Sequence, residues 1–141
     1  MALNALLLPL LAQVLLTFVV MVRMYNSRIA EFKAKGIHPE TVKTRHTFRE
    51  KLTDSAHVAD NFSNLFEMPV LFYVAMLLAM SLLVADPLLV GLAWLYVGLR
   101  VVHSAIHTTY NKVMHRFYAF AASAVVLLAI WVRLAVVLLM N

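Results

Sequence analysis

The sequence contains no cysteine, and for its length it has few charged residues, glycines and prolines. Of its 141 residues only 13% are Asp, Glu, Lys or Arg, and there are 3 glycines and 4 prolines. The lack of cysteine excludes disulfides, thiolate metal sites and cysteine nucleophiles. A soluble domain carries about 25% charged residues, so the low charge excludes an ordinary soluble protein. The low glycine and proline content excludes collagen-like and low-complexity disordered chains.

Apolar residues make up 63% of the chain, which is typical of a membrane protein. A spanning helix needs about 20 mostly apolar residues. Residues 1–22 carry no charge and lack the basic start of a removable signal peptide, so we predict that they open the first span. The Asp86-Pro87 pair predicts the cap and first residue of a later helix. We therefore predict an all-α, integral membrane four-helix bundle, a single domain over residues 1–141, with a loop at about 29–55 and spans at about 3–28, 56–85, 87–111 and 117–140.

The charges are distributed unevenly between the two sides of this topology. The net charge is +5, and most basic residues fall in two stretches, Arg23–Lys51 and Lys112–Arg116, on the same side of the four spans. By the positive-inside rule both stretches are cytoplasmic and both termini lie outside. Basic residues beside apolar spans meet anionic lipid, so we predict membrane lipid and not nucleic acid as their partner.

Several polar residues fall inside the predicted spans, where an ionisable side chain costs about 2.5–3.5 kcal/mol on insertion scales. Asp60, Asn64 and Glu67 are spaced i, i+4, i+7, within about 60° of arc on one helix face. A second stripe follows the third span: Tyr96, Arg100, His103, His107 and Asn111. Glu67 and Arg100 lie at similar predicted depths, and Arg116 opens the fourth span on the same side. The sequence therefore predicts one polar cleft in the cytoplasmic half of the bundle.

Structural alternatives stay open for these residues. A buried pair of Glu67 and Arg100 can be purely structural, each charge only neutralising the other. Asn64 can be a hydrogen-bonded bridge between two helices and not a ligand contact. The i, i+4 spacing of His103 and His107 suits a metal, but no H-E-x-x-H glutamate and no third ligand are present, so we expect none. Pro69 predicts a kink in the second span. Arg133, near the far end of the fourth span, is expected to extend to the membrane surface.

Two segments resemble a known family. Asp60–Tyr73 and Leu99–His107 are similar to the membrane-associated proteins in eicosanoid and glutathione metabolism, the MAPEG family. The Asn-x-x-Glu-x-Pro core is short, but its combination with Arg-x-x-His in span three and an arginine opening span four is more specific. The resemblance covers nearly the whole chain. The family includes microsomal glutathione transferases, leukotriene and prostaglandin synthases, and many bacterial members.

The resemblance implies a homotrimer with glutathione, as co-substrate, bound between neighbouring subunits. Asn64 and Glu67 match residues that hold the backbone and amino group of glutathione, and Arg28 matches one that receives a carboxylate. Arg100 and His103 match a pair lining the same cleft, and His107 stands where many members have a tyrosine that contacts glutathione. Arg116 matches the arginine that stabilises the thiolate, which makes it the catalytic residue. Glutathione carries two carboxylates and one ammonium, so cations with one carboxylate suit it.

Three departures from the family pattern favour a bacterial-type member. Asp60 stands where the commonest residue is an arginine. Phe117 follows Arg116 where the prostaglandin synthase has a serine. Pro69 lies closer to Glu67 than in the better-known animal enzymes.

The leading functional hypothesis is a bacterial inner-membrane transferase or peroxidase that uses glutathione on apolar electrophiles or lipid peroxides. The alternative is a non-catalytic protein of the same family that binds lipid or a partner, for which Asp60 is the motivation. A small transporter with Glu67 as a proton-coupled carboxylate ranks below both, because such transporters have short loops and no Arg–His stripe.

Overall fold

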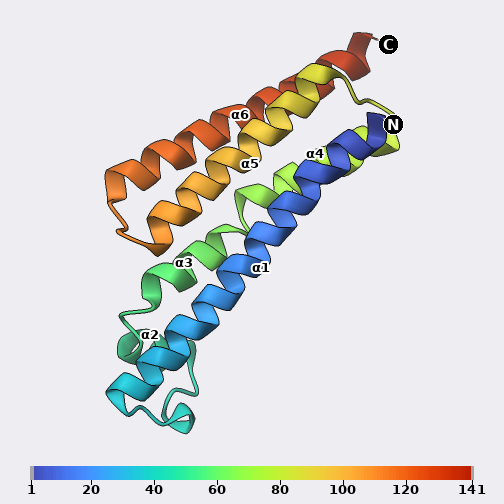
Figure 1. Cartoon of the computed structure of the whole chain (residues 1–141). Coiled ribbons are helices and arrows are strands. Elements are labelled where there is room, and N and C mark those ends of the chain that lie inside the picture. The colour runs from blue at the N-terminus through green and yellow to red at the C-terminus, as the bar shows by residue number, and fades with distance from the viewer. Residues whose placement is uncertain (1, 141) are drawn as a thin grey trace.

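The computed structural model describes residues 2–140, and the side chains of residues 4–140. The described residues form helices and no strands, which confirms the predicted all-α class. Both termini lie at one end of the bundle (Figure 1). We call this end the far end. The opposite end, which carries α2 and the turn between α5 and α6, is called the loop end. The elements in chain order are α1 (Ala2–Lys35), the 3-10 helix η1 (Pro39–Thr41), α2 (Arg45–Lys51), α3 (Ala56–Asn64), α4 (Met68–Ser81), α5 (Pro87–Thr108) and α6 (Val113–Met140).

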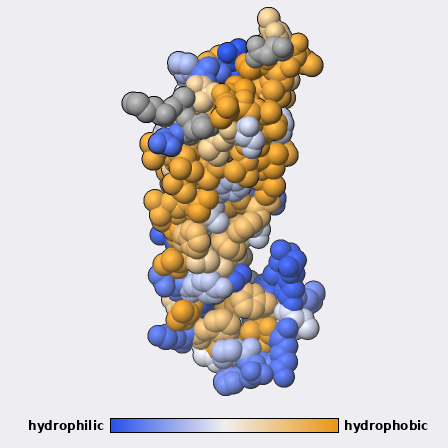
Figure 2. Space-filling view, turned by 90° about the vertical axis from the view of Figure 1, so that its right-hand side faces the viewer, coloured by the Kyte–Doolittle hydropathy of each residue, from blue (hydrophilic) through white to orange (hydrophobic). Residues whose placement is uncertain are grey.

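Four segments are long and apolar enough to cross a membrane, so the chain is an integral, multi-pass membrane protein. These are Asn4–Lys35, Ala56–Ser81, Pro87–Thr108 and Val113–Met140. Helices α5 and α6 run side by side, and α1 runs beside α3 and α4 (Figure 1). Figure 2 shows a band of apolar side chains around the middle of the molecule, with hydrophilic atoms gathered below it. This band is the surface that faces lipid.

Helix α1 is longer than the predicted span of residues 3–28. It has 34 residues, or about 51 Å, whereas the hydrocarbon core of a bilayer is about 30 Å thick. Nothing in residues 29–35 breaks a helix. The helix ends at Gly36, whose φ of 60° is a left-handed conformation that glycine adopts at no steric cost because it has no side chain. The N–H of Ile37 then donates to the carbonyl of Phe32 at 3.1 Å, which closes the helix end. The connection to α3 is therefore shorter than predicted and contains η1 and α2.

The second predicted span is two helices and not one. Helix α3 ends at Asn64 and α4 begins at Met68, and Glu67 between them has φ −98° and ψ −103°, which is not helical. Pro69 is the second residue of α4, a position that needs no N–H donor, so it starts a helix where we predicted a kink within one. The prediction that Asp60, Asn64 and Glu67 share one helix face is wrong, because Glu67 belongs to neither helix.

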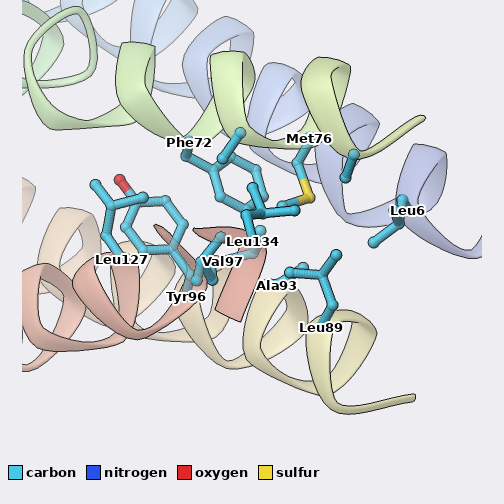
Figure 3. Close-up of a cluster of buried hydrophobic side chains, with 12 residues drawn as sticks. Leu6, Phe72, Met76, Leu89, Ala93, Tyr96, Val97, Leu127 and Leu134 are labelled. Carbon is cyan, nitrogen blue, oxygen red and sulfur yellow. The ribbon is translucent and has the colours of Figure 1, made fainter. Parts of the chain in front are cut away.

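The apolar core occupies the far half of the bundle. It joins α1, α4, α5 and α6, and Figure 3 shows its largest members pointing toward one another. The rings of Phe72 and Tyr96 stack with their centroids 4.6 Å apart. Small residues such as Ala75, Ala79 and Ala93 let the helices approach closely, which drives helix association where lipid offers no hydrophobic gain.

Asp86 joins α5 to α6 at the far end. Its Oδ1 accepts hydrogen bonds from the N–H groups of Leu88 and Leu89, both at 3.1 Å, and so caps α5 as predicted. Its Oδ2 lies 3.3 Å from the Nε of Arg133. Arg133, which we expected to extend to the membrane surface, therefore has a partner inside the chain.

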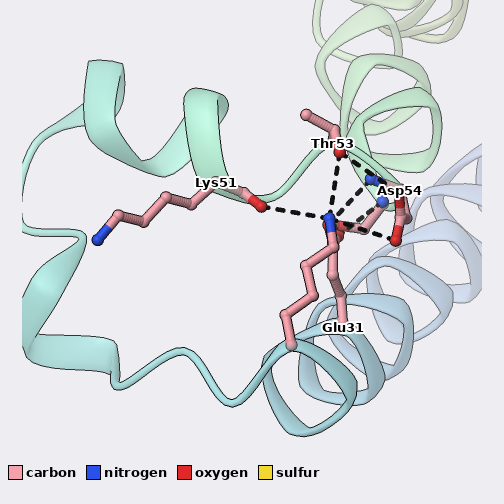
Figure 4. A network of polar contacts seen from close by, with 6 residues as sticks. Glu31, Lys51, Thr53 and Asp54 are labelled. Atoms are coloured by element: carbon pink, nitrogen blue, oxygen red, sulfur yellow. Dashed lines mark hydrogen bonds and ion pairs between the residues drawn. The ribbon is translucent and has the colours of Figure 1, made fainter.

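Glu31 fixes the loop end to α1. The side chain is buried, and its carboxylate accepts from the N–H groups of Asp54 and Ser55 at 2.9 and 2.8 Å. The hydroxyl of Ser55 adds a third bond at 2.7 Å, and the ammonium of Lys35 pairs with the same carboxylate (Figure 4). Glu31 thus holds the segment that enters α3, whose N-cap has no hydrogen bond from its own side chain.

Replacing Glu31 with alanine should destabilise the protein by about 3 kcal/mol, because three donors lose a charged acceptor at a buried site. Thermal unfolding in detergent, followed by circular dichroism, should show this loss as a fall of several degrees in the melting temperature. Lys35→Ala is the matched control: its side chain is 33% exposed, so its ion pair contributes about 1 kcal/mol or less. Equal, small shifts for both variants would contradict this role for Glu31.

Candidate functional site

Helix α5 carries the polar stripe into the interior of the bundle. Tyr96, Arg100, His103 and His107 are between 0% and 3% exposed. Their i, i+4, i+7 and i+11 spacing places them on one face, and α3 and α6 pack against α5. The far half of the bundle thus has an apolar core, whereas the loop half has a polar one.

Arg100 is a buried cation without a hydrogen-bond or ion-pair partner among the described residues. The side chain is 0% exposed, and none of its three guanidinium nitrogens has a hydrogen-bond acceptor. The ring of Phe120 lies 5.9 Å from the guanidinium carbon. Glu67 is within electrostatic range, but the two side chains form no ion pair, so the self-neutralising pair considered above is not formed. A lone charge in this position is costly, and the guanidinium keeps all five of its donors available.

The two histidines lie next to each other, with ring centroids 5.6 Å apart. The Nδ1 of His103 is 3.0 Å from the backbone carbonyl oxygen of Arg116. Because a carbonyl only accepts, Nδ1 carries the proton and Nε2 is left as an acceptor. That Nε2 and the Nδ1 of His107 have no partner within residues 4–140. In the same residues no group of three His, Cys, Asp or Glu side chains is placed to hold a metal ion.

Arg116 stands at the start of α6, next to the histidines. Its Nη1 donates to the Oδ1 of Asn111 at 2.7 Å, which orients the half-buried guanidinium. Asn111 occupies the turn between α5 and α6 with φ 47°, a conformation that asparagine tolerates better than most residues. We call Arg100, His103, His107 and Arg116 the α5–α6 cluster.

Compared with models of known protein families, the chain matches that of the MAPEG family over residues 6–136. The chain belongs to the MAPEG family. No curated protein and no solved structure matches it. The match covers most of the first and fourth spans of this MAPEG protein and all of the second and third, and it includes every residue of the α5–α6 cluster.

Asn64 and Glu67 of this MAPEG protein lie where α3 ends and α4 begins. Asn64 is half-buried at the last residue of α3, and Glu67 is exposed in the break before α4. The break thus leaves the carboxylate of Glu67 exposed.

Asn61 is the buried amide that we did not predict as a site residue. It is 0% exposed, its Oδ1 accepts from the hydroxyl of Ser104 at 3.3 Å, and its Nδ2 has no partner among the described residues. His57, also on α3, acts electrostatically on His107. Asn61 could have been found from its place three residues before Asn64, whereas nothing in the sequence singles out His57.

Arg28 lies apart from the α5–α6 cluster. It lines a cavity of about 480 Å³ between α1, α2 and α3, and this cavity contains none of the other predicted site residues. Its guanidinium carbon lies 4.7 Å from the ring centroid of Phe48. Within one chain the structure therefore brings together Arg100, His103, His107 and Arg116. It places Asn64 and Glu67 at the break between α3 and α4, and Arg28 on the wall of a different cavity.

The α5–α6 cluster can bind an anion. It combines two guanidinium groups with imidazole nitrogens, and among the described residues no carboxylate forms an ion pair with either guanidinium. Guanidinium groups hold carboxylates and thiolates well in a site of low dielectric constant. A ligand that carries both an anionic group and an ammonium would match the guanidinium groups of the cluster and the exposed carboxylate of Glu67.

Proposed function

We propose that this MAPEG protein is a glutathione-dependent transferase or peroxidase that acts on apolar electrophiles or lipid peroxides. The observation that supports this most strongly is Arg100, a fully buried cation with no acceptor on any guanidinium nitrogen. Such a residue is costly unless an anion from outside the chain meets it. Glutathione is an anion whose ammonium suits the exposed Glu67.

In this proposal the cluster residues have separate tasks. Arg100 receives a carboxylate, Asn64 and Glu67 hold the peptide backbone and the ammonium, and His103 and His107 line the same space. Arg28 lines a cavity that none of the cluster residues line, so in this proposal it meets the glutathione of a neighbouring subunit in a homotrimer. We place the protein in a bacterial inner membrane with the loop end in the cytoplasm, where glutathione is available.

Arg116 is the proposed catalytic residue. A guanidinium beside the sulfur favours the thiolate, which is the attacking species. In the transfer reaction the sulfur forms a bond to the electrophilic carbon, the leaving group departs with its electron pair, and the thiol proton passes to solvent. In the peroxidase reaction two glutathione thiols are oxidised to the disulfide while the hydroperoxide is reduced to an alcohol and water. Apolar substrates reach the site from the surrounding lipid.

Purified protein in detergent should conjugate glutathione to a chlorodinitrobenzene electrophile with a rate that saturates in glutathione. S-methyl glutathione, which keeps the charges but has no thiol, should inhibit and should raise the melting temperature. Absence of both turnover and binding would overturn the proposal. Binding without turnover on several electrophiles and hydroperoxides would overturn the catalytic part alone.

A non-catalytic role in binding lipid or a partner is the second candidate, and Asp60 favours it. Asp60 is exposed on α3 and makes no ion pair within residues 4–140, where the family's commonest residue would supply a positive charge for a carboxylate. Apolar lipids should then raise the melting temperature while glutathione leaves it unchanged. A shift with glutathione would reject this candidate.

A further inference from the structure

Asn61 is buried where α3 packs against α5, and only one end of its side-chain amide has a partner. The side chain is 0% exposed, and α3 lies against the part of α5 that leads to the loop end (Figure 1). The Oδ1 accepts a hydrogen bond from the hydroxyl of Ser104 at 3.3 Å. The Nδ2, which carries two donor hydrogens, has no hydrogen-bond partner within residues 4–140. Half of a fully buried amide is therefore unsatisfied.

A chain of hydrogen bonds holds the acceptor end of this amide. Ser104 is 2% exposed, and its backbone carbonyl accepts from the hydroxyl of Thr108, one turn further along α5, at 2.8 Å. The carbonyl of Thr108 in turn accepts from the Nη2 of Arg23 on α1 at 2.6 Å. These bonds connect α1, α5 and α3, and they end at the Oδ1 of Asn61. Because the acceptor end is occupied, the amide presents its Nδ2 as a free donor.

The free donor lies at the level of the α5–α6 cluster. Ser104 follows Arg100 by four residues and precedes His107 by three, so all three lie on one side of α5. Asn61 contacts Ser104 and therefore meets α5 between Arg100 and His107. The three guanidinium nitrogens of Arg100 and the Nδ1 of His107 also have no hydrogen-bond partner among the described residues. Unpartnered, buried nitrogen atoms of α3 and α5 thus gather at one level of the bundle.

This group of nitrogen atoms predicts the chemistry of what binds there. About 90% or more of the buried polar groups in proteins have a hydrogen-bond partner, so several unpaired ones at one level need an explanation. The guanidinium of Arg100 and the Nδ2 of Asn61 can only donate. A ligand that satisfies both must therefore bring an anionic group for the guanidinium and an acceptor oxygen for the amide.

We propose that Asn61 is a further ligand-binding residue, whose Nδ2 donates a hydrogen bond to a carbonyl or carboxylate oxygen of the thiol peptide at the α5–α6 cluster. The inference rests on the proposed function, because the ligand is the one that Arg100 receives. It narrows the thiol to one with an acceptor oxygen near its anionic group, which a peptide has and a simple alkyl thiol lacks. A site that hydrogen-bonds a ligand group discriminates against analogues without that group, since its own polar atom is then left unpaired. Asn61 thus acts in binding and specificity and not in activating the sulfur.

The test is isothermal titration of the full-length protein in detergent with S-methyl glutathione. Asn61→Leu has nearly the same size but no amide, and it should lose at least about tenfold in affinity, the effect of one hydrogen bond to a charged or buried acceptor. In the conjugation assay its KM for glutathione should rise by about the same factor, while kcat changes less than about twofold. A purely structural Asn61 would instead reduce the amount of folded protein, which lowers the apparent kcat and leaves KM and affinity unchanged.

Ser104→Ala is the matched control, because it removes the same hydrogen bond between α3 and α5 but keeps the amide of Asn61. Its affinity for S-methyl glutathione should fall less than about threefold. Equal losses in Ser104→Ala and Asn61→Leu would show that the bridge between the two helices is what matters, and this result would overturn the inference.

A second variant, Asn61→Asp, keeps the test decisive if the leucine variant does not fold. The carboxylate has the same shape and still accepts from Ser104, but it presents an oxygen where the Nδ2 donates. This variant should have the circular dichroism of the wild type and bind S-methyl glutathione at least about tenfold more weakly. Unchanged affinity in a folded Asn61 variant would overturn this inference alone, whereas no binding to the wild type would overturn the proposed function with it.

Discussion

Replacing Arg100 with methionine should raise the melting temperature of the ligand-free protein and abolish its stabilisation by glutathione. Arg100 is 0% exposed and has no acceptor on any guanidinium nitrogen, so its charge opposes folding of the empty protein. Methionine has a similar length and no charge. Replacing buried ionic groups with apolar residues stabilises proteins by about 1–4 kcal/mol, and we expect a gain within this range. Thermal unfolding with and without S-methyl glutathione measures both effects.

Arg133→Met is the matched control, because this arginine also lies within a span but has a carboxylate partner. Its Nε is 3.3 Å from the Oδ2 of Asp86, so its removal leaves that carboxylate without its cation and should lower the melting temperature. The response to S-methyl glutathione should remain. If Arg100→Met instead lowered the melting temperature and kept the response to the ligand, Arg100 would be a structural residue.

Replacing Arg116 with alanine should reduce kcat for glutathione conjugation about 100-fold, with a smaller change in KM. Removing one preorganised group that stabilises a negative charge in the reaction typically lowers kcat by about this factor. The apparent pKa of the bound thiol, read from the pH–rate profile, should rise toward that of free glutathione, because a nearby cation lowers it. Arg116→Lys should retain part of the rate, since it keeps the charge.

Asn111→Gly separates orientation from charge, because glycine accepts the φ of 47° without strain. Asn111 accepts from the Nη1 of Arg116 at 2.7 Å but is not proposed to touch glutathione. Its loss should reduce kcat by about tenfold and leave the thiol pKa nearly unchanged, because the cation remains. If Arg116→Ala lowered kcat only as far as it lowered the amount of folded protein, and the pH–rate profile did not change, the catalytic role of Arg116 would be contradicted.

The sequence was sufficient to predict the stripe from Tyr96 to His107, because one unbroken helix carries it. The prediction that Asn111 continues the stripe is wrong, because α5 ends at Thr108 and Asn111 lies in the turn that follows. Arg100, His103 and His107 follow helical spacing between Pro87 and Thr108, so their alignment depends only on the geometry of that helix. The membrane class likewise follows from composition and the length of the apolar runs. The family match over residues 6–136 agrees with the resemblance read from the motif residues.

Features that depend on tertiary contacts or on breaks in a helix could not be predicted in this way. Asn64 and Glu67 were placed by assuming a continuous helix, and the break before Met68 changed which side chains face inward, so that Asn61 is buried and Glu67 exposed. The attachment of the start of α3 to α1 depends on the bonds that Glu31 makes with Asp54 and Ser55. The separation of Arg28 from the cluster depends on where α2 packs.

The most direct test of the central claim, that the α5–α6 cluster binds glutathione, is a structure of the purified protein in a lipid nanodisc with glutathione added. We predict density for the tripeptide in contact with Arg100, its sulfur beside Arg116 and its ammonium at Glu67. An empty cluster, or one filled by an acyl chain at saturating glutathione, would contradict the account.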